Sequence, residues 1–166
     1  MLFIDNPTVE KVLSMDECID AQDIAFRGLP TGASVHRPRI DVYVPTDRTD
    51  CYFRWGTMEG ASKDLGVFAI RMKSDILYWP EDEQGFWKEE KYNTEVGLYC
   101  GLVMLFSTKN GAPLAMINDG IIQHMRVGGG AGLGAKYLSR PDSHTVGMIG
   151  SGGMARTYLE AFCSVR

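Results

Sequence analysis

The stretch that most constrains this chain lies at residues 144–166. A short apolar run at 146–149 leads into the pattern Gly-x-Gly-x-x-Ala, and apolar residues then recur with helical spacing at Tyr158, Leu159, Ala161 and Phe162. This order predicts a strand, a tight turn and a helix. In a dinucleotide-binding unit the first glycine permits the turn, the second lets the backbone approach a pyrophosphate, and a small third residue lets the helix pack on the strand.

This glycine turn, residues 150–155, supplies the candidate cofactor-binding residues, which are Gly150, Ser151, Gly152, Gly153, Met154 and Ala155. We expect them to hold a dinucleotide phosphate, because free backbone N–H groups at the start of a helix suit an anion. The alternative is an ordinary tight turn, since any strand-to-helix junction can use glycine. A Rossmann unit also has a second strand with an acidic residue about 20 positions beyond the glycines, and this sequence stops at Arg166. We therefore expect a truncated unit, with only its first strand and helix.

The residues before this turn predict an α+β fold, in which helices come first and a mixed or antiparallel sheet follows. Ser14 and Glu17 have the spacing of a capping box at the start of a helix. Alternating or apolar runs predict strands at 2–4, 40–44, 52–55, 66–73, 96–107 and 113–118. Asn110-Gly111 predicts a hairpin between the last two strands.

The middle of the chain is rich in glycine. The stretch 121–138 has helical character but contains five glycines, which are Gly128, Gly129, Gly130, Gly132 and Gly134. Each glycine costs about 1 kcal/mol relative to alanine inside a helix, and we expect close packing against a neighbouring element to offset this cost. A phosphate loop is the alternative, and we reject it because no Gly-Lys-Ser/Thr sequence ends the run. The chain then divides into a first domain at 1–120, a connecting helix at 121–143 and the start of a second domain at 144–166.

Composition and charge narrow the class of protein. The 166 residues are 45% hydrophobic and 23% charged, which is typical of a globular protein. The net charge of -4 argues against nucleic acid and anionic membranes as partners. The four cysteines are scattered and the three histidines lack metal-ligand spacing, so we expect neither disulfides nor a metal site. No apolar run reaches the length of a membrane-spanning helix, and we expect a cytoplasmic protein.

Two places in the sequence could carry chemistry. Arg126 comes directly before the glycine-rich run, where little bulk would stop a ligand, and its guanidinium could hold a carboxylate with two hydrogen bonds. The alternative for Arg126 is an ordinary ion pair. Arg71 and Lys73 end the predicted strand at 66–73, and a lysine that is partly desolvated beside a cation can act as a base or an acid near neutral pH. The alternative for Lys73 is a solvated charge at the end of a strand.

Together, these motifs resemble the ornithine cyclodeaminase/mu-crystallin family, and the resemblance covers nearly the whole chain in order. Its pieces are Pro38-Arg39 before a strand, 66–73, 101–106 with the Asn110-Gly111 turn, 113–115, 126–138, 140–142 and the glycine turn. The most specific part is the later half, which contains an arginine, a helix rich in small residues and the glycine turn.

The resemblance implies a homodimeric protein that binds NAD(H) or NADP(H) and acts at the α-carbon of an amino acid or its imine. Similar proteins include cyclodeaminases, ketimine reductases and some alanine dehydrogenases. By this resemblance, Arg39 and Arg126 would clamp the substrate carboxylate, and Lys73 would contact the substrate and assist proton transfer. The domain at 1–120 would supply substrate binding and dimer contacts.

Three departures from the family pattern stand out. Val127 follows the helix arginine where the family usually has threonine, and Met154 stands where the glycine turn usually has glutamine. Arg71 and Lys73 both lie where the family's lysine is expected, which leaves its register open. These departures keep a second interpretation open, in which the protein is a crystallin-like homodimer that binds a small ligand without catalysis. The catalytic aspartate that the resemblance leads us to expect would lie beyond the last residue, so we expect the chain as given to be inactive.

Overall fold

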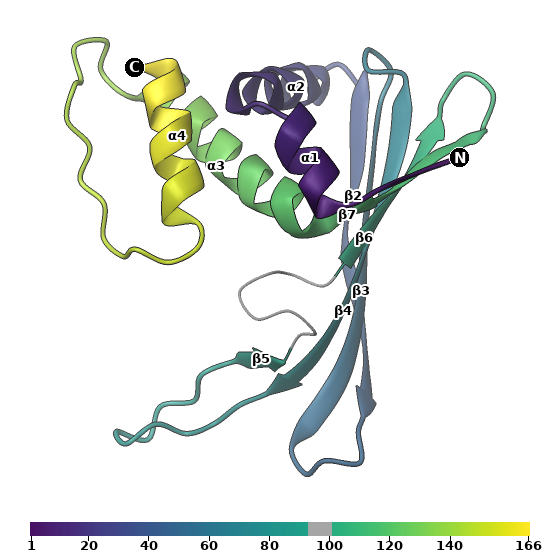
Figure 1. Ribbon diagram of the computed structural model, residues 1–166, viewed down its shortest axis with the longest axis vertical. Helices are drawn as coiled ribbons and strands as arrows, with labels where there is room; N and C mark the ends of the chain where they lie inside the picture. The colour runs from purple at the N-terminus through teal and green to yellow at the C-terminus, as the bar shows by residue number, and fades with distance from the viewer. Residues whose placement is uncertain (93–100) are drawn as a thin grey trace.

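The computed structural model describes residues 1–92 and 101–166, and its helices all lie on one face of a seven-stranded sheet (Figure 1). In chain order the elements are β1 (Leu2–Ile4), α1 (Asn6–Val12), α2 (Met15–Gly28), β2 (Ser34–Pro45), β3 (Cys51–Ser62), β4 (Val67–Tyr78), β5 (Glu90–Tyr92), β6 (Gly101–Ser107), β7 (Pro113–Asn118), α3 (Asp119–Leu138) and α4 (Ala155–Val165). The prediction of an α+β fold is confirmed. Of the predicted strand at 96–107, residues 96–100 lie outside the described residues.

The sheet is mixed, as the sequence predicts. Its strands run in the order β1-β7-β6-β4-β3-β2, and β5 pairs with one end of β4. β1 lies parallel to β7, and the other neighbouring strands are antiparallel, including the predicted hairpin of β6 and β7. Strands β3 and β4 are longer than predicted, because glycines and charged residues interrupt the alternation on which that prediction depends.

Strand β2 forms one edge of the sheet and contains an irregularity that positions a candidate residue. Its pairing with β3 shifts between Arg37 and Ile40, so that Pro38 and Arg39 together face Met58. Proline is tolerated at such a bulge on an edge strand, because it has no N–H to donate to a neighbour. β2 starts at Ser34, several residues before the alternation that predicts a strand becomes clear, and it continues through the bulge.

The first two helices begin at side-chain caps. Asp5 accepts a hydrogen bond from the N–H of Thr8 at the start of α1. The capping box of α2 is confirmed, since the Ser14 hydroxyl accepts from the N–H of Glu17 and the Glu17 carboxylate accepts from the N–H of Ser14. The apolar side of α2 then joins a buried core with α3 and α4, which consists of Met15, Cys18, Ile19, Met125, Leu133 and Ala161.

The glycines of α3 allow close packing, as the sequence predicts. A Cβ atom on Gly128 would lie 2.4 Å from the carbonyl oxygen of Thr157 in α4. A Cβ on Gly132 would lie 3.0 Å from the Cβ of Ala161, one turn further along the same helix. On another side of α3, a Cβ on Gly129 would lie 2.4 Å from the Gln22 amide nitrogen of α2. The missing side chains therefore let α2 and α4 lie directly against α3.

The predicted strand at 146–149 is wrong, although the helix after it is present as α4. Residues 146–149 adopt no regular secondary structure, and Ile149 is fully exposed. A strand needs a neighbour to accept and donate its backbone hydrogen bonds, and no described strand lies beside this segment. Gly150 has a φ of +95°, which is a conformation that glycine adopts without strain, so the tight turn itself is as expected.

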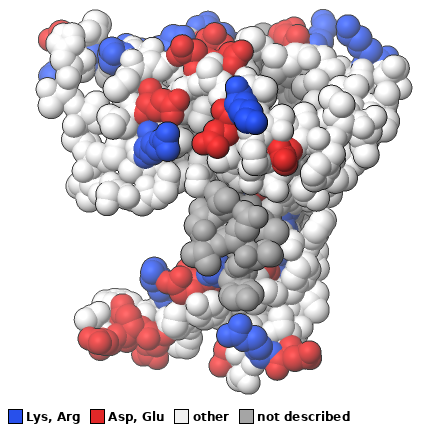
Figure 2. All heavy atoms as spheres, in the orientation of Figure 1, with Lys and Arg blue, Asp and Glu red and all other residues white. Residues whose placement is uncertain are grey.

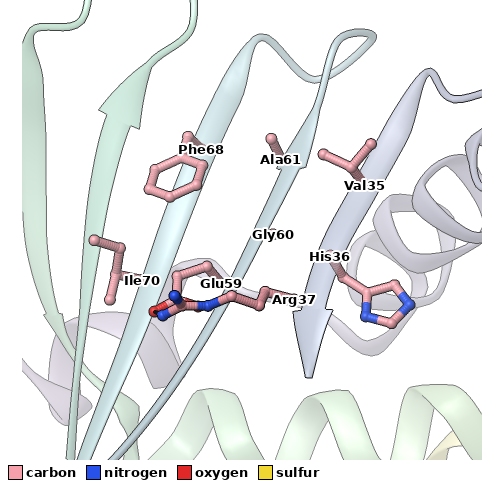
Figure 3. A pocket seen from close by; sticks show the side chains of 8 residues that line it. All are labelled: Val35, His36, Arg37, Glu59, Gly60, Ala61, Phe68 and Ile70. Carbon is pink, nitrogen blue, oxygen red and sulfur yellow. Dashed lines mark hydrogen bonds and ion pairs between the residues drawn. The ribbon is translucent and has the colours of Figure 1, made fainter. Parts of the chain in front are cut away.

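The face of the sheet that points away from the helices, called here the outer face, is largely apolar. Figure 3 shows part of it, where Val35, Ala61, Phe68 and Ile70 surround an ion pair between Arg37 and Glu59. Exposed apolar side chains continue along β2, including Val42 and Val44, which are 55% and 49% exposed. Among the described residues, no helix covers this face. No helix in the described ranges is long and apolar enough to cross a membrane.

Candidate active site

A buried group of three charged residues lies on the helix side of the sheet. The Asp75 carboxylate lies 2.5 Å from the Arg54 guanidinium and 3.1 Å from the Lys73 Nζ. Arg54 and Asp75 are opposite each other on β3 and β4, and Lys73 points to the same face as Asp75 because it is two residues away. All three residues are buried, at 5%, 6% and 2% exposure for Arg54, Lys73 and Asp75. One carboxylate therefore serves two buried cations.

Burial and charge act in opposite directions on this group. Burial lowers the pKa of Lys73, and this outweighs the attraction of Asp75, which would raise it. Burial alone would raise the pKa of Asp75, but the hydrogen bond from Arg54 and the charge of Lys73 outweigh it and hold that pKa below its usual value. Lys73 is therefore a buried amine that loses its proton more readily than a solvated lysine does.

Arg39 on β2 and Lys73 on β4 lie on the same face of the sheet, and Gly56 on β3 lies between them. The Arg39 Nε donates to the Asp41 carboxylate at 2.7 Å. Gly56 pairs with Asp41 of β2 and with Lys73 of β4. A Cβ on Gly56 would lie 2.3 Å from the Asp41 carboxylate and 3.3 Å from the Arg39 Nε, so a larger residue there would displace these two side chains. The structure thus brings two of the predicted site residues into neighbouring positions.

Arg71 connects the sheet to the first turn of α3. Its Nε and Nη2 atoms lie 2.8 Å and 2.6 Å from the Asp119 carboxylate, and Nη2 also donates to the Gln123 side chain. Asp119 is fully buried and Gln123 is 8% exposed. The prediction that Arg71 and Lys73 end a strand is wrong, because β4 continues to Tyr78. Both residues lie inside the strand, where partners from other elements hold their charges.

An open pocket of about 430 Å³ lies between Arg39 and Arg71. Its lining residues come from β2, β3, β4 and β6 and are His36, Arg37, Pro38, Arg39, Met58, Glu59, Gly60, Ala69, Arg71 and Val103. Met58 pairs with Arg71 across β3 and β4, and Gly60 pairs with Ala69. Arg39 and Arg71 therefore share the helix side of this pocket with His36 and with apolar or small residues.

Arg126 does not share this pocket in the described structure. It lies on α3, within one turn of Gln123, and its side chain is exposed. The residues that line the pocket do not include it. Arg39 lines the pocket and Arg126 does not, and the clamp of both arginines on one carboxylate stays a prediction.

The glycine turn forms a second pocket, of about 520 Å³. It is lined by Gly147, Met148, Ile149, Gly150, Gly152, Gly153, Met154, Ala155, Tyr158 and Phe162. Five of the six predicted cofactor-binding residues are in this set, and Ser151 lies exposed between them. A Cβ on Gly153 would lie 3.6 Å from the His124 ring, so the turn rests on α3. Helix α3 therefore contacts Arg71 through Asp119 in its first turn and lies against the glycine turn at His124.

One face of the molecule is hollowed and carries mixed charge. Figure 2 shows a notch between the block of helices and the arm formed by residues 79–92. Over the block of helices, acidic and basic side chains are interspersed. Asp23 of α2 forms ion pairs with both Arg27 and Lys136. Across residues 1–92 and 101–166, no three His, Cys, Asp or Glu side chains form a group that could hold a metal ion.

Sequence reasoning missed the residues that hold the candidate side chains in place. Arg54, Asp75, Asp119 and Gln123 are all buried polar residues with charged partners. A signal was present in β4, where charged residues recur with a period of two at 71, 73 and 75 within an apolar strand. Such a row predicts a polar site on one face of a sheet.

Comparisons with known proteins agree with the motifs. Residues 87–166 match the Ornithine cyclodeaminase/mu-crystallin family. Over 96% of its length the chain is 30% identical to the alanine dehydrogenase of Archaeoglobus fulgidus, of which it covers 44%. The solved structure of Thermococcus litoralis Delta(1)-pyrroline-2-carboxylate reductase, in complex with NADH and L-proline, matches with a TM-score of 0.72 and 30% identity. An archaeal alanine dehydrogenase dimer with bound NAD matches with a TM-score of 0.74 and 26% identity.

Both structural matches cover 100% of this chain and 46% of the other protein. The chain therefore spans less than half the length of the relatives that it matches. The family match covers the glycine-rich helix and the glycine turn, and the structural matches cover the sheet as well. Residues 87–166 thus match the ornithine cyclodeaminase/mu-crystallin family, and the similar proteins over the whole chain are consistent with that family, as the motifs predict.

Proposed function

We propose that this chain carries the amino-acid pocket and the first part of the dinucleotide site of an NAD(P)-dependent oxidoreductase, or of a related cyclodeaminase. The observation that carries this proposal is the position of α3. Its residue Asp119 holds Arg71, and its residue Gly128 packs on α4 directly after the glycine turn. At a rise of about 1.5 Å per residue, these two contacts lie about 14 Å apart along one helix. A relative bound to NADH and L-proline supports the choice of ligands.

In this proposal, Arg39 binds the substrate carboxylate, and Lys73, which is buried next to the pocket and does not line it, exchanges a proton with the amino nitrogen. A bound nicotinamide supplies the acceptor or donor of the hydride at the α-carbon. Because burial lowers the pKa of Lys73, its neutral form, which can take a proton, is present at a lower pH than for a solvated lysine. Asp75, 3.1 Å from Lys73, stabilises the ammonium form that results.

Turnover is tested in a protein that extends this sequence to the length of its relatives, with amino acids and cyclic imines as substrates. Nicotinamide absorbance and ammonia release are both followed, because a cyclodeaminase can recycle its cofactor. We expect Lys73→Met to lower kcat about a hundredfold through loss of the proton carrier. The exposed Lys109→Met variant should keep its kcat. No turnover by either readout, despite measurable dinucleotide binding, would overturn the proposal.

The glycine turn gives a second prediction, which concerns cofactor binding alone. No heavy atom lies within 4 Å of the place where a Cβ on Gly152 would be. Gly152→Val should therefore leave the melting temperature unchanged, but its methyl groups would fill the space in which a pyrophosphate approaches the backbone. We expect the Kd for NADH to rise about tenfold or more, measured by fluorescence titration. Gly134→Val, at an equally open glycine in α3, is the matched control. An unchanged Kd in Gly152→Val would count against this site.

We also propose that the protein is a homodimer that buries the outer face of the sheet. The exposed valines of β2, Val42 and Val44, lie on the same face as the pocket around the Arg37–Glu59 pair, which Figure 3 shows. Large exposed apolar surfaces of this kind mark contacts with other proteins, and a related archaeal alanine dehydrogenase is a dimer. We expect light scattering to give the mass of a dimer, and Val42→Asp to give that of a monomer.

The control for this prediction is Val12→Asp, which places the same charge on α1, on the opposite side of the sheet. Val12 is 67% exposed, compared with 55% for Val42, so both substitutions leave the core intact. Val12→Asp should remain a dimer. A monomeric unsubstituted protein would disprove the proposed interface.

A second candidate function is a crystallin-like homodimer that binds a small ligand without catalysis. The exposed position of Arg126, outside the pocket that contains Arg39, favours it. The turnover experiment separates the two candidates, because a binding protein would take up dinucleotide and amino acid without releasing ammonia or changing the nicotinamide.

We propose a cytoplasmic location for either function. Cys18, Cys51 and Cys163 are free thiols, and free thiols are common in proteins of a reducing compartment. Fractionation of cells that express the protein, with detection by antibody, tests this location.

A further inference from the structure

We propose that His124 is a further cofactor-binding residue, whose imidazole donates a hydrogen bond to the phosphates of the bound dinucleotide. The inference deepens the proposed function and rests on it, because it takes the glycine turn as the dinucleotide site. His124 lies on α3, and it stands beside the pocket of the glycine turn without lining it. The pattern of glycines in the turn does not indicate this residue, because it lies on a different helix.

The packing of α3 on α4 brings His124 to the glycine turn. The two helices lie side by side (Figure 1), and Gly128 of α3 packs on Thr157 of α4. The contact of Gly132 follows one turn further along both helices, so they run in the same direction. One turn before Gly128, the same offset joins His124 to Gly153, since residues four apart share a face of a helix. His124 therefore faces the start of α4.

The polar edge of the His124 ring is directed at the turn. The ring atom that approaches a Cβ on Gly153 is Cε1, at 3.6 Å. Cε1 is the carbon between Nδ1 and Nε2, so both ring nitrogens lie next to the atom that meets the turn. A neutral imidazole has one N–H donor and an imidazolium has two. In either state His124 can donate a hydrogen bond to an anion that the turn binds.

The start of α4 favours an anion. Its N-cap residue, Met154, makes no side-chain hydrogen bond to the helix, whereas Asp5, Ser14 and Asn118 cap α1, α2 and α3. Residues 143–159 contain no aspartate or glutamate that would repel a phosphate. The uncapped N–H groups and the partial positive charge of the helix end suit a phosphate. His124 adds a side-chain donor to these backbone donors.

The test measures NADH binding by fluorescence titration, with the extended protein used for turnover. His124→Leu should raise the Kd for NADH about tenfold, the loss expected for one hydrogen bond to a charged acceptor. Its melting temperature should stay unchanged, because His124 is only partly buried. His124→Gln keeps an N–H donor and should bind NADH within about threefold of the unsubstituted protein. His144→Leu, at an exposed histidine before the turn, is the matched control and should keep its Kd.

An unchanged Kd in His124→Leu would overturn the inference. An equal rise in His124→Leu and His124→Gln would also overturn it, because the packing of the ring, and not its donor, would then be the cause.

Nuclear magnetic resonance of the histidine rings gives a measurement on the unsubstituted protein, which holds even if the variants at position 124 do not fold. The ring signals of His124 should shift when NADH is added, whereas those of His144 should not. Unshifted His124 signals at saturating NADH would contradict the proposed contact. Failure of the proposed function would appear separately, as NADH binding that depends on His124 without turnover of any substrate.

Discussion

Replacing Asp75 by asparagine is expected to lower the free energy of unfolding by about 3–5 kcal/mol, which is the range for breaking a buried ion pair from one side. Asp75 lies within 2.5 Å of the Arg54 guanidinium and 3.1 Å of the Lys73 Nζ. Asparagine has nearly the same shape, so the packing is retained and the loss comes from two buried cations that no longer share a carboxylate. Urea denaturation monitored by circular dichroism measures this difference.

The control is Asp142→Asn, in which the same substitution is made at a carboxylate that is 82% exposed and lies 3.8 Å from Arg140. Exposed ion pairs contribute little to stability, so this variant should unfold at the same urea concentration as the unsubstituted chain. If both substitutions lowered the free energy of unfolding equally, the charged group around Asp75 would not be the cause of the loss in Asp75→Asn.

The effect of Asp75 should also depend on pH. Its pKa in the folded chain is held below the ordinary value of 3.8, because Arg54 and Lys73 outweigh the effect of burial. A lowered pKa contributes stability that is fully present above the ordinary value and is lost as the pH falls through the folded value. The difference between the unsubstituted chain and Asp75→Asn should therefore be constant near neutral pH and shrink below pH 3.8. A difference that does not change down to that pH and below it would contradict this account.

Replacing Gly128 by alanine should destabilise the chain by about 3 kcal/mol, at the upper end of the range for overpacking. The new Cβ would lie 2.4 Å from the carbonyl oxygen of Thr157 and 2.6 Å from its carbonyl carbon. Both are backbone atoms, so no side-chain rotation relieves the contact and α4 has to move. The gain of about 1 kcal/mol in helix propensity offsets only part of this cost.

Gly134→Ala is the matched control, because it makes the same substitution in the same helix. No heavy atom lies within 4 Å of a Cβ on Gly134, so this variant should be about 1 kcal/mol more stable than the unsubstituted chain. Thermal unfolding should thus give shifts of opposite sign for the two variants. Shifts of the same sign would mean that the contact with α4 does not explain why position 128 requires glycine.

The parts of the fold that were predicted from the sequence depend on local interactions. The capping box of α2 joins Ser14 and Glu17, three residues apart, and the Asn110-Gly111 turn sets its hairpin within a few residues. The close packing of the α3 glycines was also predicted, because the cost of glycine in a helix implies a compensating contact. The strand at 146–149 failed for the converse reason, since a strand depends on a neighbour that its own sequence does not contain.

The site was predicted in part. Lys73 and Arg39 were identified, and the structure places them on either side of Gly56. Their partners could not be identified in the same way, because strand pairing brings Arg54 to Asp75 and the packing of a helix brings Asp119 to Arg71. The exposure of Arg126 depends on how α3 is rotated about its axis, which the contacts of its glycines determine.

The packing of α3 has a consequence for the order in which the chain folds. Five glycines between 128 and 134 reduce the intrinsic helix stability of this segment by about 5 kcal/mol relative to alanine, and a segment with so low a propensity does not stay helical in water by itself. Its helical state is therefore gained when α2 and α4 dock against it. We therefore expect the segment that joins the two pockets to become ordered no earlier than the docking of α2 and α4.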